Sequence, residues 1–281
     1  MDGLLAWADG RLVGPEEPAV RAADHGVTVG DGVFETLKVT GGRPFALTRH
    51  LRRLTRSATG LGLPAPDEDT VRAGVDAVLS CGTPIGFGRL RVVVTGGTGP
   101  LGSARGDGRL GYLVLAAPVP APGPSTAVCV VPWTRNERSA VAGLKTTSYA
   151  ENAVALAYAS ARGAGEALLT NTRGELCEGT GSNAVLGIDG ALVTPPLSSG
   201  CLAGITRELL LEWGAGDGLP VRERVLTLDD LHSADEVMIT SSTRDVQAVA
   251  RVDDRELPAP GPLASRAGAV FRKRAAADLD P

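Results

Sequence analysis

The sequence predicts an α+β fold in two domains, on three observations. Strand-like and helix-like segments follow one another without the regular βαβα order of a doubly wound sheet. Asp-Gly and Gly-Gly pairs separate short apolar runs, as is typical of hairpins. Alternating prolines from Pro118 to Pro124 predict an extended linker. We therefore expect an N-terminal α+β domain over 1–117, a Pro-rich linker over 118–124 and a larger C-terminal domain over 125–281.

The first domain is predicted to open with two hairpins and to continue with two helices. Asp9-Gly10 and Gly41-Gly42 provide the hairpin turns. Thr48 is expected to cap a helix that carries leucines at helical spacing and ends near Gly60–Gly62. The elements predicted here are strands over 4–6, 11–13, 33–40 and 43–47, helices over 48–61 and 67–81, and strands over 89–95 and 110–116.

The second domain is predicted to contain more strands than helices. Ser148 and Glu151 match the capping box that opens a helix, and Gly163 is expected to end that helix. Asp189-Gly190 joins two strands in a hairpin. The elements predicted here are a helix over 148–163, strands over 166–170, 175–178, 184–188 and 191–194, a helix over 204–213, strands over 221–225, 236–240 and 246–252, and a terminal helix rich in Arg and Ala.

Composition excludes several classes of protein. The chain has 281 residues, of which 43% are hydrophobic, and a net charge of -4, so it lacks the basic footprint of a nucleic-acid-binding protein. No apolar run is long enough to cross a bilayer, and Met1-Asp2-Gly3 does not begin a signal peptide. Scattered cysteines without a CxxC pair indicate free thiols, so we expect a cytoplasmic protein. Three histidines are too few for a His-rich metal site, and we expect no metal.

Familiar catalytic motifs are absent or incomplete. Gly97–Gly102 matches GxGxxG, but a loop rather than a helix follows it, so we reject a dinucleotide site and expect a flexible loop there. Leu144 precedes Lys145 where a Walker A motif requires glycine. Neither a GxSxG nor an HExxH sequence occurs, which leaves serine and zinc hydrolases without support.

Lys145 is the most informative residue, because the chain uses arginine for nearly every cation. Lys38 and Lys273 lie in a strand-like run and a basic patch, and we interpret both as solvated charges. Lys145 lies among small and apolar neighbours without an adjacent acid. A desolvated lysine can lose its proton and form a Schiff base, which arginine cannot do. A water-facing lysine on a strand edge remains the alternative on this segment alone.

Other weak signals agree with that chemistry. Gly204-Ile205-Thr206-Arg207 opens a helix whose free amides favour a phosphate, and Thr240–Thr243 is a hydroxyl-rich turn after a strand. Glu178 ends a strand in a glycine-rich turn, where it is either a surface charge or a partner for a ring nitrogen. Either one of the two helix arginines, Arg49 or Arg53, points inward, or both are solvated. A reactive amine, a carboxylate and a phosphate cradle are together what pyridoxal phosphate (PLP) requires.

The ordered set of motifs resembles the fold-type IV PLP-dependent enzymes, the class IV aminotransferase family. The resemblance covers nearly the whole chain. The motifs that carry it are Asp24-His25-Gly26, Gly30-Asp31-Gly32-Val33-Phe34-Glu35-Thr36, His50-Leu51-Arg52-Arg53-Leu54, Gly143-Leu144-Lys145-Thr146, Glu178-Gly179-Thr180-Gly181-Ser182-Asn183, Gly204-Ile205-Thr206-Arg207 and Thr240-Ser241-Ser242.

The resemblance implies a D-amino-acid-aminotransferase-like fold, a homodimer, a small amine substrate and a PLP-binding C-terminal domain, with the cofactor between the domains. It makes Lys145 the Schiff-base lysine and general base, and Glu178 the partner of the pyridine nitrogen. The residues it implies for the phosphate are Arg53, Ile205, Thr206 and Ser242. A catalytically silent PLP binder is disfavoured because Lys145 and Glu178 are both present.

The choice of family member rests on few residues. Phe34 and Thr36 share a strand face that the resemblance directs into the substrate pocket, and a threonine at position 36 resembles 4-amino-4-deoxychorismate lyase. Gly96 stands where D-amino-acid aminotransferases carry an arginine, and His25 replaces the arginine usual in the DRG pattern. The candidates for holding substrate carboxylates are Arg91, Arg105 and Arg135.

The leading prediction is therefore the lyase, which eliminates pyruvate and gives 4-aminobenzoate, a folate precursor. Lys145 would remove the proton and Thr36 would protonate or position the leaving group. The alternative is an aminotransferase that moves an amino group from a branched-chain L-amino acid or a D-amino acid to a 2-oxo acid.

Overall fold

The computed structural model describes residues 3–14 and 16–281, so Met1 and Asp2, part of the N-terminal pattern considered above, lie outside the described residues. The chain forms two compact units. The first contains the chain up to Ala121 together with Leu144–Tyr149 and Leu279–Pro281, and the second contains Pro122–Gly143 and Ala150–Asp278.

This division differs from the predicted domain ranges in one functional respect. The chain passes from one unit to the other after Ala121, inside the predicted linker, but the segment that carries Lys145 belongs to the first unit. Thr146 forms a bridge with Val33, and the Thr147 amide donates to the Gly32 carbonyl at 2.8 Å. These backbone contacts attach the segment to a strand of the first unit.

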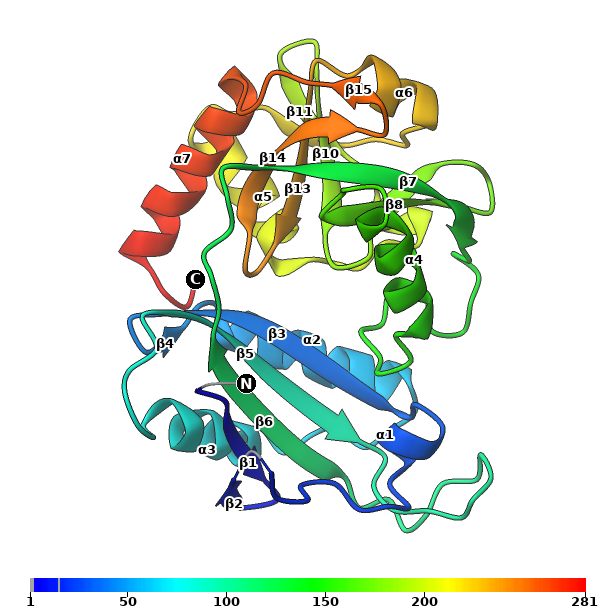
Figure 1. Cartoon of the computed structure of the whole chain (residues 1–281), viewed down its shortest axis with the longest axis vertical. Helices are drawn as coiled ribbons and strands as arrows, with labels where there is room; N and C mark the ends of the chain where they lie inside the picture. The colour runs from blue at the N-terminus through cyan, green and yellow to red at the C-terminus, as the bar shows by residue number, and fades with distance from the viewer. Residues whose placement is uncertain (1–2, 15) are drawn as a thin grey trace. The chain divides into compact units, whose positions relative to one another are not determined.

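The first unit is a six-stranded antiparallel sheet with helices on one face (Figure 1). Its strand order is β2-β1-β6-β5-β3-β4. The strands are β1 (Leu5–Ala8), β2 (Arg11–Val13), β3 (Gly32–Thr40), β4 (Arg43–Pro44), β5 (Phe87–Thr95) and β6 (Gly111–Pro118), and the helices are α1 (His25–Thr28), α2 (Leu47–Gly60) and α3 (Glu68–Leu79).

Strand alternation sets which face of this sheet is covered. Val33 and Leu37 of β3, with Leu90 of β5, are fully buried in the core that the sheet shares with α2 and α3. Phe34 and Thr36 point to the opposite face. The alternation therefore directs the predicted substrate-side residues away from the helical layer.

Two predictions of local structure in this unit were wrong. Helix α2 begins at Leu47 after a left-handed Ala46 without a side-chain cap, and the Thr48 amide donates instead to the Asp280 carboxylate at 2.8 Å. Lys38 is not a solvated charge: it is 9% exposed, and its ammonium lies 5.1 Å from the centre of the Phe45 ring.

The second unit is built on a nine-stranded mixed sheet. Strands β12 to β9 follow the order β12-β11-β10-β13-β14-β7-β8-β9, and β15 pairs with β14. The strands are β7 (Ser125–Arg135), β8 (Glu166–Asn171), β9 (Leu176–Gly179), β10 (Asn183–Ile188), β11 (Ala191–Thr194), β12 (Val221–Glu223), β13 (Glu236–Ser241), β14 (Asp245–Val252) and β15 (Arg255–Glu256). The helices are α4 (Ala150–Ser160), the 3₁₀ turn η1 (Leu197–Ser199), α5 (Ile205–Gly216), α6 (Leu228–Ser233) and α7 (Pro262–Ala277).

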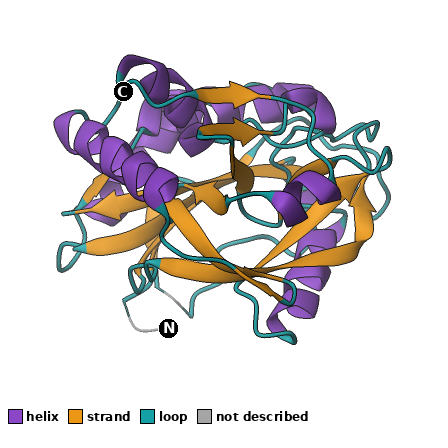
Figure 2. Cartoon of the chain, turned by 90° about the horizontal axis from the view of Figure 1, so that it is seen from above, coloured by secondary structure: helices purple, strands orange, loops and turns teal. Residues whose placement is uncertain are grey.

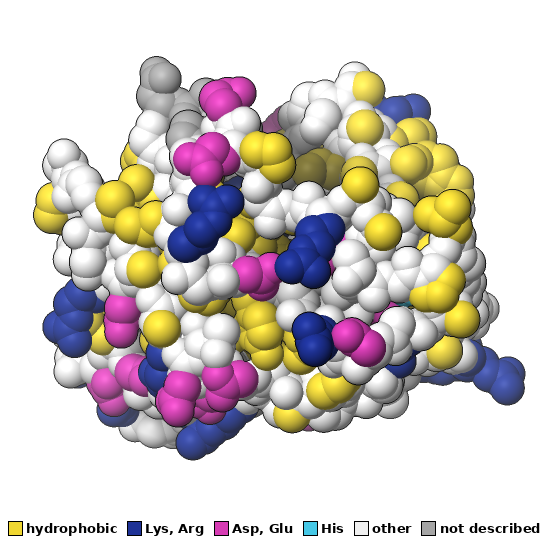
Figure 3. Space-filling view, turned by 90° about the horizontal axis from the view of Figure 1, so that it is seen from below, with side chains coloured by type: hydrophobic (Ala, Val, Ile, Leu, Met, Phe, Trp, Pro, Cys, Tyr) yellow, Lys and Arg dark blue, Asp and Glu magenta, His cyan; other side chains and the backbone are white. Residues whose placement is uncertain are grey.

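Each unit thus combines a sheet with helices, which confirms the predicted α+β class (Figure 2). Within the described ranges, no helix combines the length and apolarity needed to cross a membrane. Basic and acidic side chains are interspersed on the face drawn in Figure 3. The surface seen there carries no extended area of positive charge.

Candidate active site

The predicted site residues fall into two sets, one in each unit. The first unit holds Lys145, Phe34, Thr36, Arg53, Arg91 and Arg105. The second unit holds Glu178, Ile205, Thr206, Ser242 and Arg135. Each set is described by itself.

The backbone of Lys145 is held between a strand and a helix of the first unit. The Phe34 amide of β3 donates to the Lys145 carbonyl at 3.0 Å. The Lys145 amide donates to the Ser57 hydroxyl of α2 at 3.2 Å. On the α2 side, a Cβ at Gly60 would lie 2.8 Å from the Leu144 side chain, so glycine permits this close packing.

The side chain of Lys145 lies among aromatic rings. Its Nζ is 4.5 Å from the centre of the Phe34 ring and 5.5 Å from that of Tyr149. The two rings meet edge to face with centres 5.1 Å apart. Both distances are within the range of a cation–π interaction with the lysine ammonium.

Arg53 belongs to a buried ionic cluster. Its guanidinium donates to both oxygens of Glu35, at 2.7 Å from Nε and 2.6 Å from Nη2. His50 Nδ1 lies 2.6 Å from the same carboxylate. Burial alone would raise the pKa of Glu35, but Arg53 and then His50 hold that pKa well below its ordinary range. Burial lowers the pKa of His50, although Glu35 opposes the shift.

The three candidate arginines differ in what they already bind. Arg105 pairs with Asp31 and Arg135 with Glu151, so both are engaged by carboxylates. Arg91 makes no hydrogen bond or ion pair with the described residues, and its guanidinium carbon lies 4.6 Å from the Phe34 ring centre. Arg91 therefore shares the Phe34 ring with Lys145.

Glu178 contacts a backbone amide and an arginine in the second unit. Its Oε2 accepts from the Leu202 amide at 2.9 Å, and its Oε1 is 3.4 Å from Arg135 Nε. Arg135 also donates to Glu151 and, at 3.2 Å, to Asn152. The arrangement gives Arg135 a place beside the predicted ring-nitrogen partner, a role that the sequence did not indicate.

The start of α5 is a candidate anion-binding cradle, called the α5 cradle below. Helix α5 begins at Ile205, and its N-cap Gly204 has no side-chain cap, so its first amides remain for a ligand. A Cβ at Gly204 would collide with the Asn183 amide oxygen. Asn183 in turn pairs with Thr240 at the end of β13, whose buried hydroxyl oxygen has no hydrogen-bond partner among the described residues. Ser242 follows two residues later.

The residues of each unit, taken separately, fit PLP. Glu178 and the α5 cradle are joined by the short segment 202–206, which suits a ligand with a ring nitrogen at one end and a phosphate at the other. The first unit offers a lysine in an aromatic environment and a rigidly oriented arginine. Among the described residues, no group of three His, Cys, Asp or Glu side chains is placed to hold a metal.

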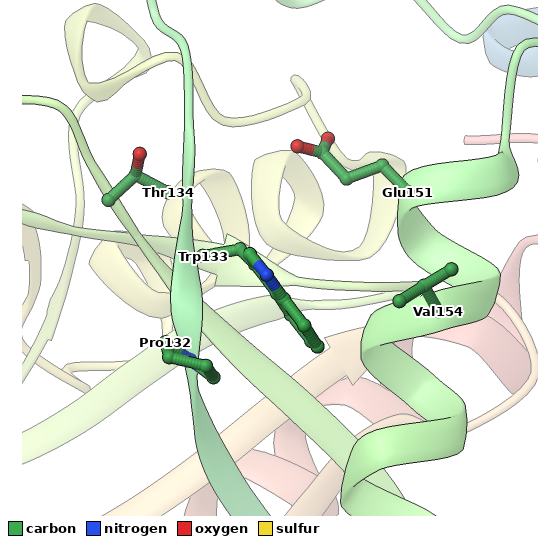
Figure 4. Close-up of a pocket in the computed structure, with 5 residues that line it drawn as sticks. All are labelled: Pro132, Trp133, Thr134, Glu151 and Val154. Carbon is green, nitrogen blue, oxygen red and sulfur yellow. The ribbon is translucent and has the colours of Figure 1, made fainter.

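A surface pocket of the second unit lies beside Arg135, since its lining includes Thr134 and Glu151, the residue with which Arg135 pairs. It is formed by the end of β7 and by α4 (Figure 4). Trp133 is 42% exposed there and packs edge to face with Tyr158, with ring centres 5.4 Å apart. The lining residues are Pro132, Trp133, Thr134, Glu151 and Val154.

Sequence reasoning missed the residues that orient the predicted ones. Glu35 and His50 hold Arg53, and Tyr149 covers Lys145, yet none was assigned a role. Glu35 carried a usable signal, because a carboxylate on the covered face of a strand requires a buried cation.

Comparison with known proteins shows the family. Residues 32–252 match the model of the family described as amino-transferase class IV, so the chain belongs to this family and the expected resemblance is confirmed. A bifunctional aminodeoxychorismate lyase / D-amino acid transaminase of Mycobacterium tuberculosis is 32% identical over 280 residues, 91% of this chain and 93% of the relative.

Two solved structures extend the likeness to the fold. Branched-chain aminotransferase from Thermoproteus uzoniensis, with norvaline, has a TM-score of 0.89 at 28% identity and covers 96% of this chain and 94% of that one. A hypothetical aminotransferase from Mycobacterium tuberculosis, in its PLP-bound form, has a TM-score of 0.85 at 29% identity, covering 96% and 97%. The predicted fold-type IV architecture is confirmed, and the chain is an enzyme of this class.

Proposed function

We propose that this protein is a PLP-dependent aminotransferase that takes its amino group from an apolar, branched-chain L-amino acid and passes it to a 2-oxo acid. The coarser part, membership of the class IV aminotransferases, rests on the family match. The finer part rests on the side chains around Lys145. It replaces the lyase as the leading function.

Lys145 is the proposed cofactor lysine and proton carrier. PLP, when bound, supplies the electron sink that makes the Cα–H bond of an amine substrate acidic. The Lys145 amine would accept that proton and later give it back, which is a general acid–base role. Glu178 would lie beside the ring nitrogen, where a carboxylate favours the protonated form of the ring. The phosphate is assigned to Arg53, Ile205, Thr206 and Ser242.

Arg91 is the observation that carries the assignment of the substrate. Among the described residues, Arg91 pairs with no acid. Arg91 and Lys145 both contact the Phe34 ring, at 4.6 Å and 4.5 Å from its centre. A carboxylate bound by Arg91 would bring an amino acid close to the Lys145 amine, with Phe34 and Tyr149 against its apolar side chain. A carboxylate-binding arginine at position 96 is disfavoured, because a Cβ there would lie 2.6 Å from an Asp31 oxygen.

The lyase is retained as a second candidate on one observation. The Thr36 hydroxyl oxygen is buried and has no hydrogen-bond partner among the described residues, and Thr36 faces Arg91 across β3 and β5. A hydroxyl so placed suits a leaving group that must be protonated. The bifunctional relative described above is consistent with both activities in one fold.

The test compares substrates and two neighbouring arginines. Purified enzyme with PLP is given L- and D-amino acids with 2-oxoglutarate, and separately 4-amino-4-deoxychorismate with detection of 4-aminobenzoate. We expect transamination of branched-chain L-amino acids. Arg91→Gln should raise KM for the amino acid about 10-fold to 100-fold, the value of a charge-assisted bidentate contact. Arg89 is exposed like Arg91 but lies opposite Lys38 instead of Thr36, so Arg89→Gln should leave KM within about 2-fold.

Two results would contradict the proposal. Rapid formation of 4-aminobenzoate without transamination would make the lyase the function. An active Lys145→Ala variant would remove the mechanism altogether. We further propose, from the family resemblance, that the protein is a cytoplasmic homodimer. Light scattering of the purified protein would test the dimer.

A further inference from the structure

Arg105 holds together the two elements between which Lys145 lies. It comes from the 96–110 loop of the first unit, far in sequence from both. Its Nε and Nη2 donate to the two Asp31 oxygens, each at 2.7 Å. Its Nη1 and Nη2 also donate to the Gly62 and Leu61 carbonyls, each at 2.8 Å, directly after α2. One guanidinium thus joins the turn before β3 to the end of α2.

The same two elements carry the backbone of the Lys145 segment. On the β3 side, the Gly30 carbonyl accepts the Thr147 and Ser148 hydroxyls at 2.9 and 3.0 Å. On the α2 side, Ser57 accepts the Lys145 amide. Asp31 lies directly after Gly30, and Leu61 lies four residues after Ser57. Arg105 therefore contacts each element close to the residue that binds the lysine segment.

The surroundings are shaped for this contact. A Cβ at Gly96 would lie 2.6 Å from Asp31 Oδ2, and one at Gly62 would lie 3.0 Å from Arg105 Nη1. The Arg105 side chain is 38% exposed, so charge alone would give the pair little stability. Its bidentate geometry and two further carbonyl contacts instead give it a fixed position at the negative end of the α2 dipole.

We propose that Arg105 is a positioning residue for Lys145: by clamping Asp31 to the end of α2, it fixes the separation of the two elements that hold the lysine. This differs from the substrate-carboxylate role considered for Arg105 in the sequence. The inference rests on the proposed role of Lys145 as the cofactor lysine.

The experiment uses Arg105→Gln, Arg105→Lys and Asp31→Asn in the full chain. Arg109→Gln is the matched control, since Arg109 lies in the same loop, is 89% exposed and, among the described residues, pairs only with Asp107, at 3.3 Å. Three quantities are measured: hydrogen–deuterium exchange of residues 144–149 without substrate, the rate at which visible absorbance forms when PLP is added to apoenzyme, and kcat and KM for the amino acid.

We expect Arg105→Gln to speed exchange in 144–149, to slow PLP capture about 10-fold and to lower kcat about 10-fold with KM within about 2-fold, because misplacement of a reacting group acts on the chemical step. Arg105→Lys, which cannot make the bidentate contact, should give exchange, PLP capture and kcat values between those of the parent and those of Arg105→Gln. The double variant Arg105→Gln/Asp31→Asn should be no worse than either single change, since both break one contact. Arg109→Gln should match the parent.

Two outcomes would overturn the clamp. A rise in KM alone, with exchange and PLP capture unchanged, would make Arg105 a substrate ligand. Parent-like behaviour of both Arg105 variants would leave the residue without a role. Borohydride reduction followed by peptide mass analysis shows separately whether PLP is on Lys145. If it is not, the proposed function fails, while the exchange data still decide whether Arg105 orders the segment.

Discussion

At the scale of single residues, charge placement around Glu178 decides its chemistry. The Leu202 amide and Arg135 contact the Glu178 carboxylate, and a carboxylate beside a ring nitrogen favours the protonated ring. Glu178→Gln should therefore keep the visible absorbance of bound PLP and lower kcat about 100-fold, a typical effect of losing one electrostatic or acid–base partner. Steady-state kinetics on the PLP-loaded variant measure this.

The control for that change is Glu175→Gln, three residues earlier, where the carboxylate pairs with Arg173 at 2.6 Å. It should leave kcat within about 2-fold, because the contacts of Glu175 are with Arg173 and Asn171 and not with Leu202 or Arg135. Equal losses in both variants would mean that Glu178 acts through the stability of β9 and not through the cofactor.

Sequence reasoning found the residues with unusual chemistry and missed the ones that orient them. Lys145 stood out because lysine is rare in this chain. Arg135 was named as a candidate for substrate carboxylates, but its place beside Glu178 was not predicted, because that contact joins residues far apart in sequence. Lys38 was misinterpreted for a similar reason: its burial depends on the Phe45 ring across the hairpin.

At the scale of elements, local signals predicted hairpins and helices well where turns are short. The Asp9-Gly10 turn joins β1 and β2, and Asp189-Gly190 joins β10 and β11, as expected. Strand β7 was missed because it follows the proline run and contains Pro132. The first residue of α2 was misplaced because Thr48 is bound by Asp280, a residue that only the folded chain brings there.

The N-terminus of α5 offers an element-scale test. Gly204→Ala introduces a Cβ that would collide with the Asn183 amide oxygen, so either the first turn of α5 or the Asn183 side chain must shift. We expect the Kd for PLP to rise about 10-fold and the free energy of unfolding of the apoprotein to fall by about 1–3 kcal/mol, as for overpacking. Fluorescence titration and denaturant unfolding measure the two.

Gly123→Ala is the matched control in the same unit, because the nearest atom to its new Cβ is 3.6 Å away, an ordinary contact. Its Kd for PLP should equal that of the parent. An unchanged Kd in Gly204→Ala would remove the α5 amides from the phosphate site.

At the scale of the whole molecule, the buried Glu35–His50–Arg53 cluster links stability to pH. Burial lowers the pKa of His50 in the folded protein, so the unfolded chain takes up a proton that the folded chain refuses. The free energy of unfolding is therefore unaffected by the titration of His50 above the unfolded pKa of about 6.5, and it falls as the pH drops below that value. The free energy of unfolding should therefore decrease from pH 7 to pH 5, by up to about 1.4 kcal/mol per pH unit for one proton.

The measurement is denaturant unfolding of the apoprotein at several pH values, compared with two variants. His50→Asn keeps a donor toward Glu35 but cannot titrate, so its stability should vary less with pH in this window. His232→Asn changes a histidine that is 46% exposed, and the slope should remain that of the parent. Below about pH 4.5 both variants should lose further stability, because Glu35, whose pKa is held low by Arg53 and His50 against the effect of burial, is then protonated only on unfolding. A His50→Asn variant with the full parental slope would place the linked proton elsewhere in the molecule.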